Sequence, residues 1–513
     1  MIGNGTASGT AVCTEAFDSG EPRQVPAGKK ARGWRAIDIS KIAIAFSLTM
    51  AIADWFSAIR APLWLDETNS YYSIAGGFSQ IWSRQGLSFP LYSYILWLTK
   101  TLFGSSEVVL RMPSVFAMVG AVYLLYRIAR EWFTPDVAAI VILVFCLNPI
   151  VSFEAVDARP YAFAALVTNG AILCLLRWLR TGDKRDVIFF GALAAGIFYF
   201  HYLFSVVIPP LLLIVFFASR SEWRRVAREL SVGLVPFSLM MLPVFSRLVY
   251  LVETRQSHVY TGAPLGSELI NTIAPRNIGL VFLGAVFLTV ILRKLAPEGE
   301  LRSVIVPCLM LGAIPLAILY GVSMFTPIHV FLPRYRLVAL PGIALCWGLL
   351  VGRLDSKPVR VALCIALILF TFDELPCSTW KSHGYSWKDA LEIADTDAAP
   401  DGAPLLIASG LIESDFAPLP TDIENSPMFA PLTYYRVHER VVPLPRDLKP
   451  SATAQVNKFL ATATPARQRF LVVVHGGYDW PIRDWITSVT KEYYSAHEIG
   501  VYDGVSVTEY VPR

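Results

Sequence analysis

Long apolar runs separated by short polar connections make up most of the chain between residues 42 and 372. A helix needs about 20 apolar residues to cross the roughly 30 Å hydrocarbon layer of a membrane, and runs near this length recur along the segment. The pattern predicts eleven spans, at about residues 41–60, 110–130, 135–153, 160–179, 186–200, 203–219, 229–250, 278–294, 303–325, 335–352 and 358–373.

Two segments between the first and second spans have a different character. Residues 68–82 are amphipathic, with tyrosines and a tryptophan that suit a membrane surface, and residues 90–103 are short and carry Lys100. Reading 90–103 as a span would move every later basic connection to the other side of the membrane. We therefore predict two interfacial helices here.

After residue 381 the apolar runs become short and are separated by turns. Residues 405–408, 470–474 and 504–511 are predicted strands, and residues 387–393 and 451–460 are predicted helices. This pattern indicates a small α/β domain over residues 381–513. The stretch HGGYDW at residues 475–480 follows a strand and could contact a ligand, although an ordinary glycine turn is the favoured interpretation.

Composition agrees with a membrane protein. The 513 residues are 54% hydrophobic and 16% charged, with a mean hydropathy of +0.50, whereas soluble domains are about one quarter charged. The predicted fold is all-α and polytopic, with about eleven transmembrane and two interfacial helices in residues 39–375, followed by the α/β domain. The net charge of +4 is explained by cations beside the spans, and nothing suggests nucleic acid binding.

Residues 1–38 are rich in small and polar residues and end in a basic run. They are predicted to form a disordered cytoplasmic tail. No apolar core precedes Ile42, so the first span is expected to stay as an anchor rather than be cleaved. Seven cysteines without a CxxC pair indicate neither a disulfide framework nor a zinc site.

The basic residues collect in alternate connections, which the positive-inside rule assigns to the cytoplasm. The other connections and the α/β domain are then expected to face outward, which in a bacterial inner membrane is the periplasm. These outward connections contain the polar residues that are candidates for catalysis or ligand binding. They include Asp66-Glu67, the turn from Glu154 to Arg159, His201-Tyr202, and the segment from Thr326 to Arg336.

The stretch PLWLDETNSYY at residues 62–72 places two adjacent carboxylates at the outer end of the first span. A carboxylate held close to lipid can acquire the pKa of a useful general base. The alternative is that Asp66 and Glu67 only begin the next helix, where acids meet the positive end of the helix dipole.

Arginines occur in two of the other outward connections. Arg159 directly precedes Pro160 at the start of a span, and its planar guanidinium suits a phosphate; pairing with Asp157 or Glu154 is the alternative. Arg334 and Arg336 lie on the outer side, although the positive-inside rule favours cations on the cytoplasmic side. Cations placed in this way call for an anionic partner. That partner would be a lipid headgroup or a lipid-linked phosphate substrate. His201 and Tyr202 are interpreted as amphipathic anchors.

Acids and arginines thus gather at one face of the membrane. This arrangement suits a donor whose leaving group is a phosphate anchored in the bilayer. The acid would take a proton from an acceptor hydroxyl, and an arginine would neutralise charge as the sugar–phosphate bond breaks.

Six motifs occur in an order that resembles the polyprenyl-phosphate-sugar-dependent glycosyltransferases of the GT-C superfamily. In particular they resemble the lipopolysaccharide galacturonosyltransferases and, more distantly, the protein O-mannosyltransferases and lipid A aminoarabinose transferases. The motifs are LWLDETNSYY (63–72), SFPLYSYILWLTKTLFG (88–104), EVVLRMPSVFAMVGAVYLLYRIAREWF (107–133), FEAVDARPYAF (153–163), HYLF (201–204) and FLPRYRLVALPG (331–342).

The resemblance implies an outward active site with Asp66 as catalytic base and Glu67 assisting or contacting the acceptor. The family's PPLY-like motif reads Phe89-Pro90-Leu91-Tyr92 here, and Ser88 stands where the aminoarabinose transferases carry a phosphate-binding lysine. The phosphate contacts are therefore assigned to arginines. The candidates for phosphate are Arg159, Arg334 and Arg336, and those for other substrate contacts are Tyr71, Tyr92, Asp157, Tyr161 and His201.

The sequence therefore predicts an inverting glycosyltransferase of the bacterial inner membrane. Its donor is a polyprenyl-phosphate sugar, and its acceptor is a hydroxyl on lipid A, another envelope glycan or a protein. No cofactor is required, although Asp66 with Glu154 or Asp157 could recruit a divalent metal. Two alternatives remain: a lipid-linked-sugar transporter, with Asp54 and Asn169 as its few intramembrane polar residues, and a membrane-anchored glycan-binding scaffold.

Overall fold

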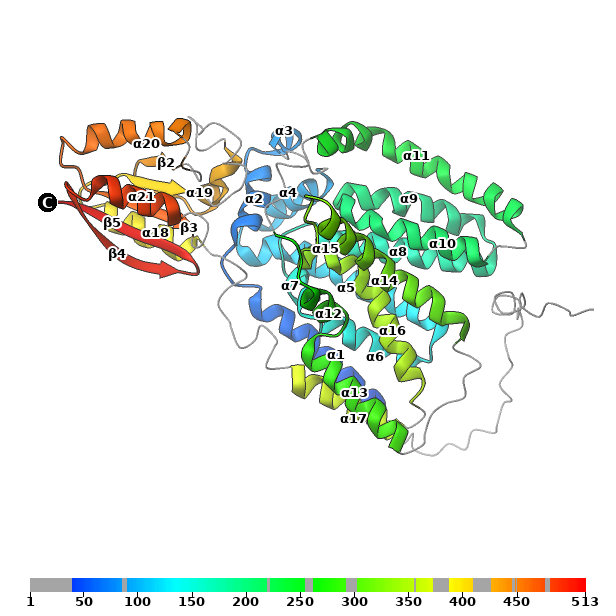
Figure 1. Cartoon of the computed structure of the whole chain (residues 1–513). Coiled ribbons are helices and arrows are strands. Elements are labelled where there is room, and N and C mark those ends of the chain that lie inside the picture. The colour runs from blue at the N-terminus through cyan, green and yellow to red at the C-terminus, as the bar shows by residue number, and fades with distance from the viewer. Residues whose placement is uncertain are drawn as a thin grey trace, which may run out of the picture.

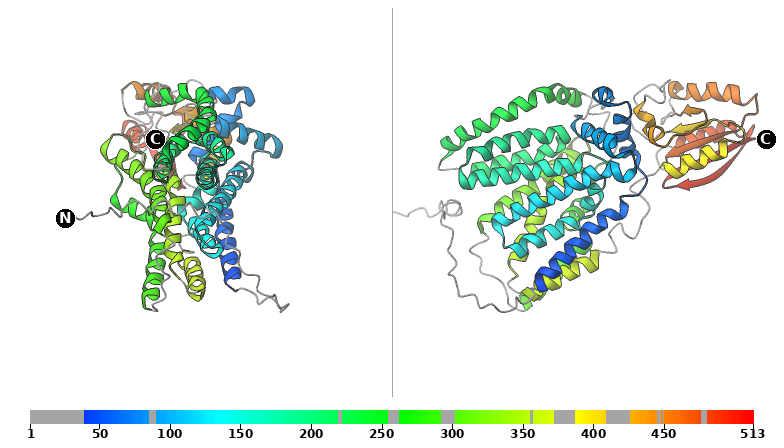
Figure 2. Two further views of the ribbon diagram at one scale, coloured as in Figure 1. Left: turned by 90° about the vertical axis from the view of Figure 1, so that its right-hand side faces the viewer. Right: turned by 180° about the vertical axis from the view of Figure 1, so that it is seen from behind.

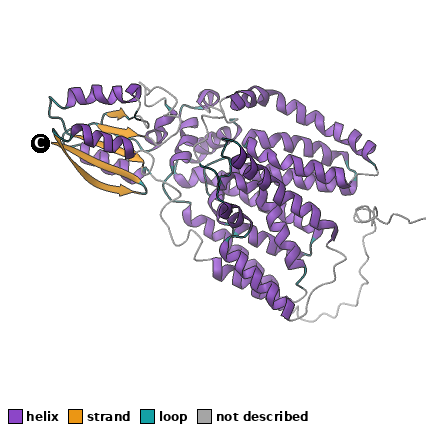
Figure 3. Ribbon diagram, in the orientation of Figure 1, coloured by secondary structure: helices purple, strands orange, loops and turns teal. Residues whose placement is uncertain are grey.

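The computed structural model describes residues 39–84, 90–218, 222–253, 262–291, 302–354, 357–371, 387–408, 426–444, 448, 450–475 and 480–513. A body of helices carries a smaller α/β domain at one end (Figure 1). All strands of the described residues belong to that small domain (Figure 3). The predicted tail 1–38, Ser88, Phe89 and residues 476–479 of HGGYDW lie outside the described residues.

Helices occur at all eleven predicted spans. The α-helices of the body are α1 (Ile39–Trp55), α2 (Leu65–Ala75), α3 (Ile81–Arg84), α4 (Leu91–Phe103), α5 (Glu107–Trp132), α6 (Pro135–Cys146), α7 (Pro149–Ala155), α8 (Tyr161–Thr181), α9 (Lys184–Phe200), α10 (Ile208–Ala218), α11 (Trp223–Glu253), α12 (Gly266–Ile273), α13 (Arg276–Ile291), α14 (Arg302–Phe325), α15 (Pro333–Arg336), α16 (Leu340–Gly352) and α17 (Lys357–Thr371). Short 3₁₀ segments are η1 (Phe56–Ala58), η2 (Phe78–Gln80), η3 (Tyr202–Val207) and η5 (Leu337–Ala339).

By length and composition, five helices of the described chain could cross a membrane, or seven if each of two bent pairs counts as one span. Shorter apolar helices lie at Ile42–Ala58, Tyr202–Ala218 and Pro358–Phe370. Large apolar side chains such as Phe116, Phe245 and Phe287 are about two-thirds exposed on the outside of the body. Such a surface suits lipid rather than water. The chain is a multi-pass membrane protein, and the number of spans stays a prediction.

The third predicted span is broken at Asn148-Pro149. Helices α6 and α7 meet there at 74°. Asn148 ends the first helix and caps the second, because its side chain accepts a hydrogen bond of 3.0 Å from the Ile150 amide, and Pro149 is favourable at the first helical position. The bend turns the acidic segment at the end of α7 towards the start of α8, where Arg159 lies.

The two predicted interfacial helices are α4 and the segment made of α2, η2 and α3. Large apolar side chains remain exposed on them, among them Phe78, Trp82, Leu102 and Phe103. The opposite face is buried, with Tyr92 and Leu96 of α4 in a core shared with Ile74 of α2. This two-sided character agrees with a position at the membrane surface.

The α/β domain has one five-stranded sheet in the order β2-β1-β3-β5-β4. Its strands are β1 (Leu405–Ala408), β2 (Val441–Pro443), β3 (Phe470–His475), β4 (Tyr494–Tyr502) and β5 (Val505–Pro512). Strand β1 is parallel to β2 and β3, and β5 is antiparallel to β3 and β4.

Helices cover both faces of this sheet (Figure 2). The elements are α18 (Lys388–Ala398), η9 (Pro427–Phe429), α19 (Ala430–Tyr434), α20 (Pro450–Ala463) and α21 (Trp480–Thr490). One core cluster contains α20 and α21 side chains such as Phe459 and Ile486. The other contains Trp387, Leu391 and Phe429 from the α18 and η9 side.

The predicted strands and helices of this domain are confirmed, but two strands were missed. Strand β2 has only three residues. Strand β4 is an edge strand with a mixed burial pattern and an irregular register near Glu498 and Gly500, so its sequence lacks the alternation of a half-buried strand. The turn Asp503-Gly504, with φ of 45° and 84°, is the signal that identifies this hairpin, because such turns need two residues with positive φ.

The five cysteines in the described residues are all free. Cys13 and Cys377 fall outside the described part of the chain.

Candidate active site

The two acids at the start of α2 have different surroundings. Trp64 is extended, and its amide donates a 3.2 Å hydrogen bond to the Glu67 carboxylate, which fixes the helix start. Neighbouring residues on a helix point about 100° apart. Glu67 accordingly faces the protein interior, where it is 1% exposed, while Asp66 remains partly exposed.

Glu67 forms a fully buried ion pair with Arg111 of α5. The Nη2 and Nε atoms of Arg111 lie 2.6 and 2.7 Å from the two Glu67 oxygens. The amide of Ala158 also donates to Glu67, at 2.8 Å. These contacts use both carboxylate oxygens within the protein. The structure therefore does not support the predicted contact of Glu67 with the acceptor, and places Glu67 as an internal link.

Arg111 also holds the loop that leads from the first span to Asp66. Its guanidinium donates to the carbonyl oxygens of Ala58, Ile59, Ala61 and Pro62 at 2.5–3.1 Å. A buried guanidinium needs hydrogen-bond partners for its N–H groups, because an unpaired buried charge is costly. The loop, α5 and the turn before α8 are joined through this one side chain and Glu67.

Asp66 lies between two arginines from distant parts of the chain. Its Oδ2 atom is 2.5 Å from Nη1 of Arg334 and 3.9 Å from Nη2 of Arg159. Nη1 of Arg159 donates to the Asp66 carbonyl oxygen at 3.0 Å and to the Ser70 hydroxyl at 3.3 Å. The three side chains keep between 15 and 21% exposure, so they remain accessible to a ligand. The structure thus brings together the acid and two of the three predicted arginines.

Asp157 supports this arrangement from inside the protein. Its Oδ1 atom accepts a hydrogen bond of 3.0 Å from the indole of Trp64, and its side chain is buried. Burial, with the Glu154 and Glu67 carboxyl groups nearby, raises the pKa of Asp157 well above its ordinary value. A buried carboxyl of this kind holds its proton and serves the fold rather than the substrate.

A raised carboxyl pKa has a defined effect on stability. The protonated Asp157 carboxyl stabilises the folded state fully below the ordinary aspartate pKa of about 4. This stabilisation is lost as the pH rises through the pKa that Asp157 has in the folded protein. Asp157→Asn needs no proton and keeps an oxygen for the Trp64 indole. As the pH is raised above the ordinary aspartate pKa of about 4, we expect the unfolding temperature of the variant to fall less than that of the wild type. Equal pH dependence in thermal unfolding would contradict a protonated Asp157.

An aromatic group lies next to the arginines. The His201 ring is 5.0 Å from both Tyr161 and Tyr335, while Arg159 and Arg334 approach the Tyr161 and Tyr335 rings at 5.9 and 5.4 Å. Burial, with Arg334 and Arg159 nearby, lowers the pKa of His201 to about 3. His201 is therefore neutral and can donate one hydrogen bond without adding charge.

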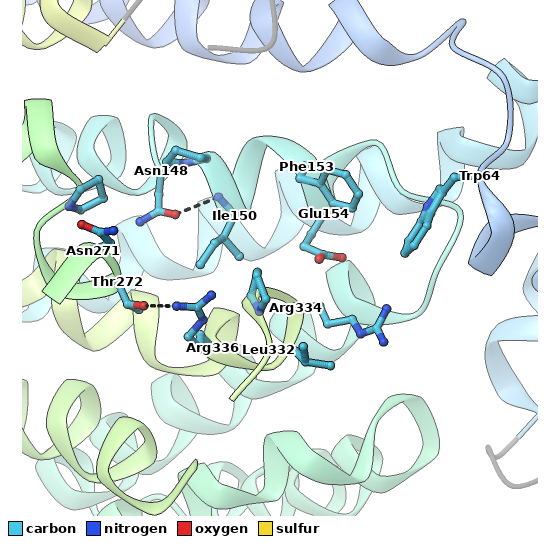
Figure 4. Close-up of a pocket in the computed structure, with 13 residues that line it drawn as sticks. Trp64, Asn148, Ile150, Phe153, Glu154, Asn271, Thr272, Leu332, Arg334 and Arg336 are labelled. Carbon is cyan, nitrogen blue, oxygen red and sulfur yellow. Dashed lines mark hydrogen bonds between the residues drawn. The ribbon is translucent and has the colours of Figure 1, made fainter. Parts of the chain in front are cut away.

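Arg334, the partner of Asp66, lines a cavity of about 680 Å³ (Figure 4). One end is polar and contains Arg334, Glu154 and the Trp64 ring, and apolar side chains such as Ile150 and Phe153 line its wall. The volume is in the range of small-ligand sites, which combine apolar walls with a few polar groups.

Arg336 lies at the other end of this cavity from Arg334 (Figure 4). Its Nη1 atom donates to the Thr272 hydroxyl at 2.8 Å and to the Glu268 carbonyl oxygen at 3.0 Å. Arg336 thus contacts α12 rather than Asp66, and its part in a phosphate clamp with Arg159 stays a prediction.

Tyr71 and Tyr92 were also predicted to contact substrate. Tyr71 packs edge-on against Tyr434 of the α/β domain, with ring centroids 4.8 Å apart. Tyr92 is 3% exposed and packs against Phe163. Neither side chain lines this cavity, and their contact with substrate stays a prediction.

Sequence reasoning missed Arg111 and Trp64 as parts of the site, and it named Glu154 only as a partner of Arg159 or a possible metal ligand. The signal for Arg111 was present, because a cation at the outer end of an apolar span calls for a buried partner. Within the described residues, no three His, Cys, Asp or Glu side chains gather in a way that could hold a metal ion.

Comparison with known proteins gives a family match over part of the chain and a fold. The family model for dolichyl-phosphate-mannose-protein mannosyltransferases matches residues 88–250. No curated protein sequence matches the chain. Similar solved structures include ArnT from Cupriavidus metallidurans in the apo state, with a TM-score of 0.55, 14% identity and coverage of 92% of this chain and 98% of that one.

Two further structures have the same fold. ArnT from the same organism bound to undecaprenyl phosphate has a TM-score of 0.54 and 14% identity, covering 91% of this chain and 97% of that one. The Archaeoglobus fulgidus oligosaccharyltransferase in the apo form has a TM-score of 0.50 and 13% identity, covering 93% of this chain and 75% of that one.

Proposed function

We propose that the chain is a membrane glycosyltransferase of the GT-C superfamily and that it transfers a sugar from a polyprenyl-phosphate donor to an acceptor hydroxyl. The observation that carries this proposal is the meeting of Asp66 with Arg334 and Arg159 beside a cavity with apolar walls. Two cations at one carboxylate leave a net positive charge, which suits a phosphate group. A structure of the same fold is bound to undecaprenyl phosphate.

In the proposed reaction, Asp66 takes the proton of the acceptor hydroxyl. The acceptor oxygen forms a bond to the anomeric carbon while the bond from that carbon to the phosphate oxygen breaks. Its electron pair leaves with polyprenyl phosphate, and attack from the opposite face inverts the anomeric centre. Arg334 and Arg159 stabilise the second negative charge that the leaving phosphate gains.

The donor phosphate would replace Asp66 as the partner of Arg334. Arg334 now donates to Asp66 at 2.5 Å, and a base engaged in this way accepts a proton poorly. Binding of an anion between the arginines would release the carboxylate towards the acceptor. The neutral His201 is our candidate for a contact with the sugar or phosphate, whereas Tyr161 is 1% exposed and packs against the His201 ring.

The proposed location is the periplasmic side of the bacterial inner membrane, with lipid A, another envelope glycan or a protein as acceptor. Its support is the outward placement of the acid and arginines by the distribution of basic connections.

The function is tested with purified protein in vesicles. Undecaprenyl phosphate carrying radiolabelled mannose or galacturonic acid serves as donor, and envelope membranes from cells lacking the protein provide acceptors. We expect release of undecaprenyl phosphate together with label in an envelope component. Movement of the labelled lipid between leaflets without any transfer would instead support the transporter.

A further inference from the structure

The α/β domain contacts the loop that carries Asp66. Helix α19 packs against α2, and the domain lies beside α2 in both views (Figures 1 and 2). The Leu63 amide donates to the Tyr435 hydroxyl at 2.6 Å. The hydroxyl of Tyr434 donates to the Ser105 carbonyl oxygen, between α4 and α5, at 2.8 Å.

Packing reinforces these hydrogen bonds. Leu65 precedes Asp66 and packs against the domain core cluster that contains Trp387, Leu391 and Phe429. The Tyr71 ring, one turn further along α2, lies between Tyr434 and the ammonium group of Lys100, at 4.8 and 4.6 Å. Residues on both sides of Asp66 in α2 are thus held by the domain.

The same loop is fixed from the opposite side by Arg111. That guanidinium donates to the Pro62 carbonyl oxygen at 3.0 Å, and the next residue donates its amide to Tyr435. The backbone of residues 62–65 is therefore clamped between the membrane body and the α/β domain. This clamp sets where α2 begins, and with it the position of Asp66.

We propose that the α/β domain is a positioning element of the active site, acting through Tyr435 and Leu65. Neither residue touches the reacting atoms, and both hold the backbone that presents Asp66. Displacement of the domain by a ligand or partner would release residues 62–65 and slow the transfer. The effect on the rate rests on the proposed function, whereas the clamp itself does not.

Tyr435→Phe keeps the ring and removes the hydroxyl, so it tests the hydrogen bond alone. We expect kcat to fall about threefold to tenfold, the range for loss of one neutral hydrogen bond, with the donor KM unchanged. Leu65→Ala should lower kcat by about tenfold to a hundredfold, because small misplacement of a reacting group is costly. Amide hydrogen exchange in residues 61–65 should become faster in both variants.

Matched controls are Tyr493→Phe and Leu448→Ala, which alter side chains exposed by 55% and 42% on the same domain. Both should match the wild type in kcat and in exchange. The assay uses the undecaprenyl-phosphate sugar that the wild-type protein turns over.

Wild-type kcat and exchange in both Tyr435→Phe and Leu65→Ala would overturn the inference. So would a rise in donor KM at unchanged kcat, since that would place the contacts in binding rather than in positioning. If wild-type protein transfers no sugar, the proposed function fails, and the exchange result alone then decides: faster exchange supports the clamp and unchanged exchange refutes it.

Discussion

Asp66→Asn is expected to lower sugar transfer by about 10²- to 10⁴-fold, the usual contribution of a general base. Asparagine has nearly the same shape but cannot take the acceptor proton. Binding of undecaprenyl phosphate should be unchanged or tighter, because a carboxylate that competes with the phosphate for Arg334 and Arg159 is gone. The measurement is single-turnover transfer in vesicles alongside equilibrium binding of the labelled lipid.

The matched control for this substitution is Asp389→Asn, which alters an exposed acid in the first turn of α18. It should transfer sugar at the wild-type rate. Near-normal transfer by a folded Asp66→Asn protein would rule out Asp66 as the base.

Arg111→Met is expected to destabilise the fold by about 3–5 kcal/mol, the cost of leaving one partner of a buried ion pair uncompensated. The substitution strands the Glu67 carboxylate and also removes the donors to four loop carbonyls. Thermal unfolding in detergent would show a large fall in the transition temperature. The double variant Arg111→Met, Glu67→Gln should recover part of the loss, because no charge then remains buried.

Arg127→Met provides the control within the same helix. The Arg127 guanidinium contacts the Tyr123 ring and hydroxyl at the surface of α5, and such exposed contacts contribute little. Its transition temperature should stay near that of the wild type. Equal effects of the two substitutions would show that the Arg111–Glu67 pair has no special structural role.

Much of the helical body could be predicted from sequence, because membrane thickness fixes the length of an apolar helix. The break at Asn148-Pro149 lies inside the predicted span 135–153, and a hydropathy pattern cannot show it. The α/β sheet was harder to predict. Strands β1 and β3 are almost wholly apolar, whereas the edge strand β4 is polar and irregular.

The site was predicted in part. Asp66, Arg159 and Arg334 were predicted as a group, together with Arg336, because all lie in connections that the positive-inside rule places on the outer side. The roles of the two adjacent acids could not be separated, since either Asp66 or Glu67 could have faced inward. That choice depends on Arg111, which lies 44 residues away from Glu67. The contact between Leu63 and Tyr435 spans 372 residues, and no local pattern indicates it.

The central claim is that Arg334 and Arg159 hold the donor phosphate next to Asp66. Equilibrium binding of radiolabelled undecaprenyl phosphate to Arg334→Gln, Arg159→Gln and the control Arg127→Gln tests it most directly. The account predicts affinity about 10- to 100-fold weaker in each of the first two variants, as expected for loss of a charge-assisted hydrogen bond, and wild-type affinity in the control. Wild-type affinity in both Arg334→Gln and Arg159→Gln would contradict it.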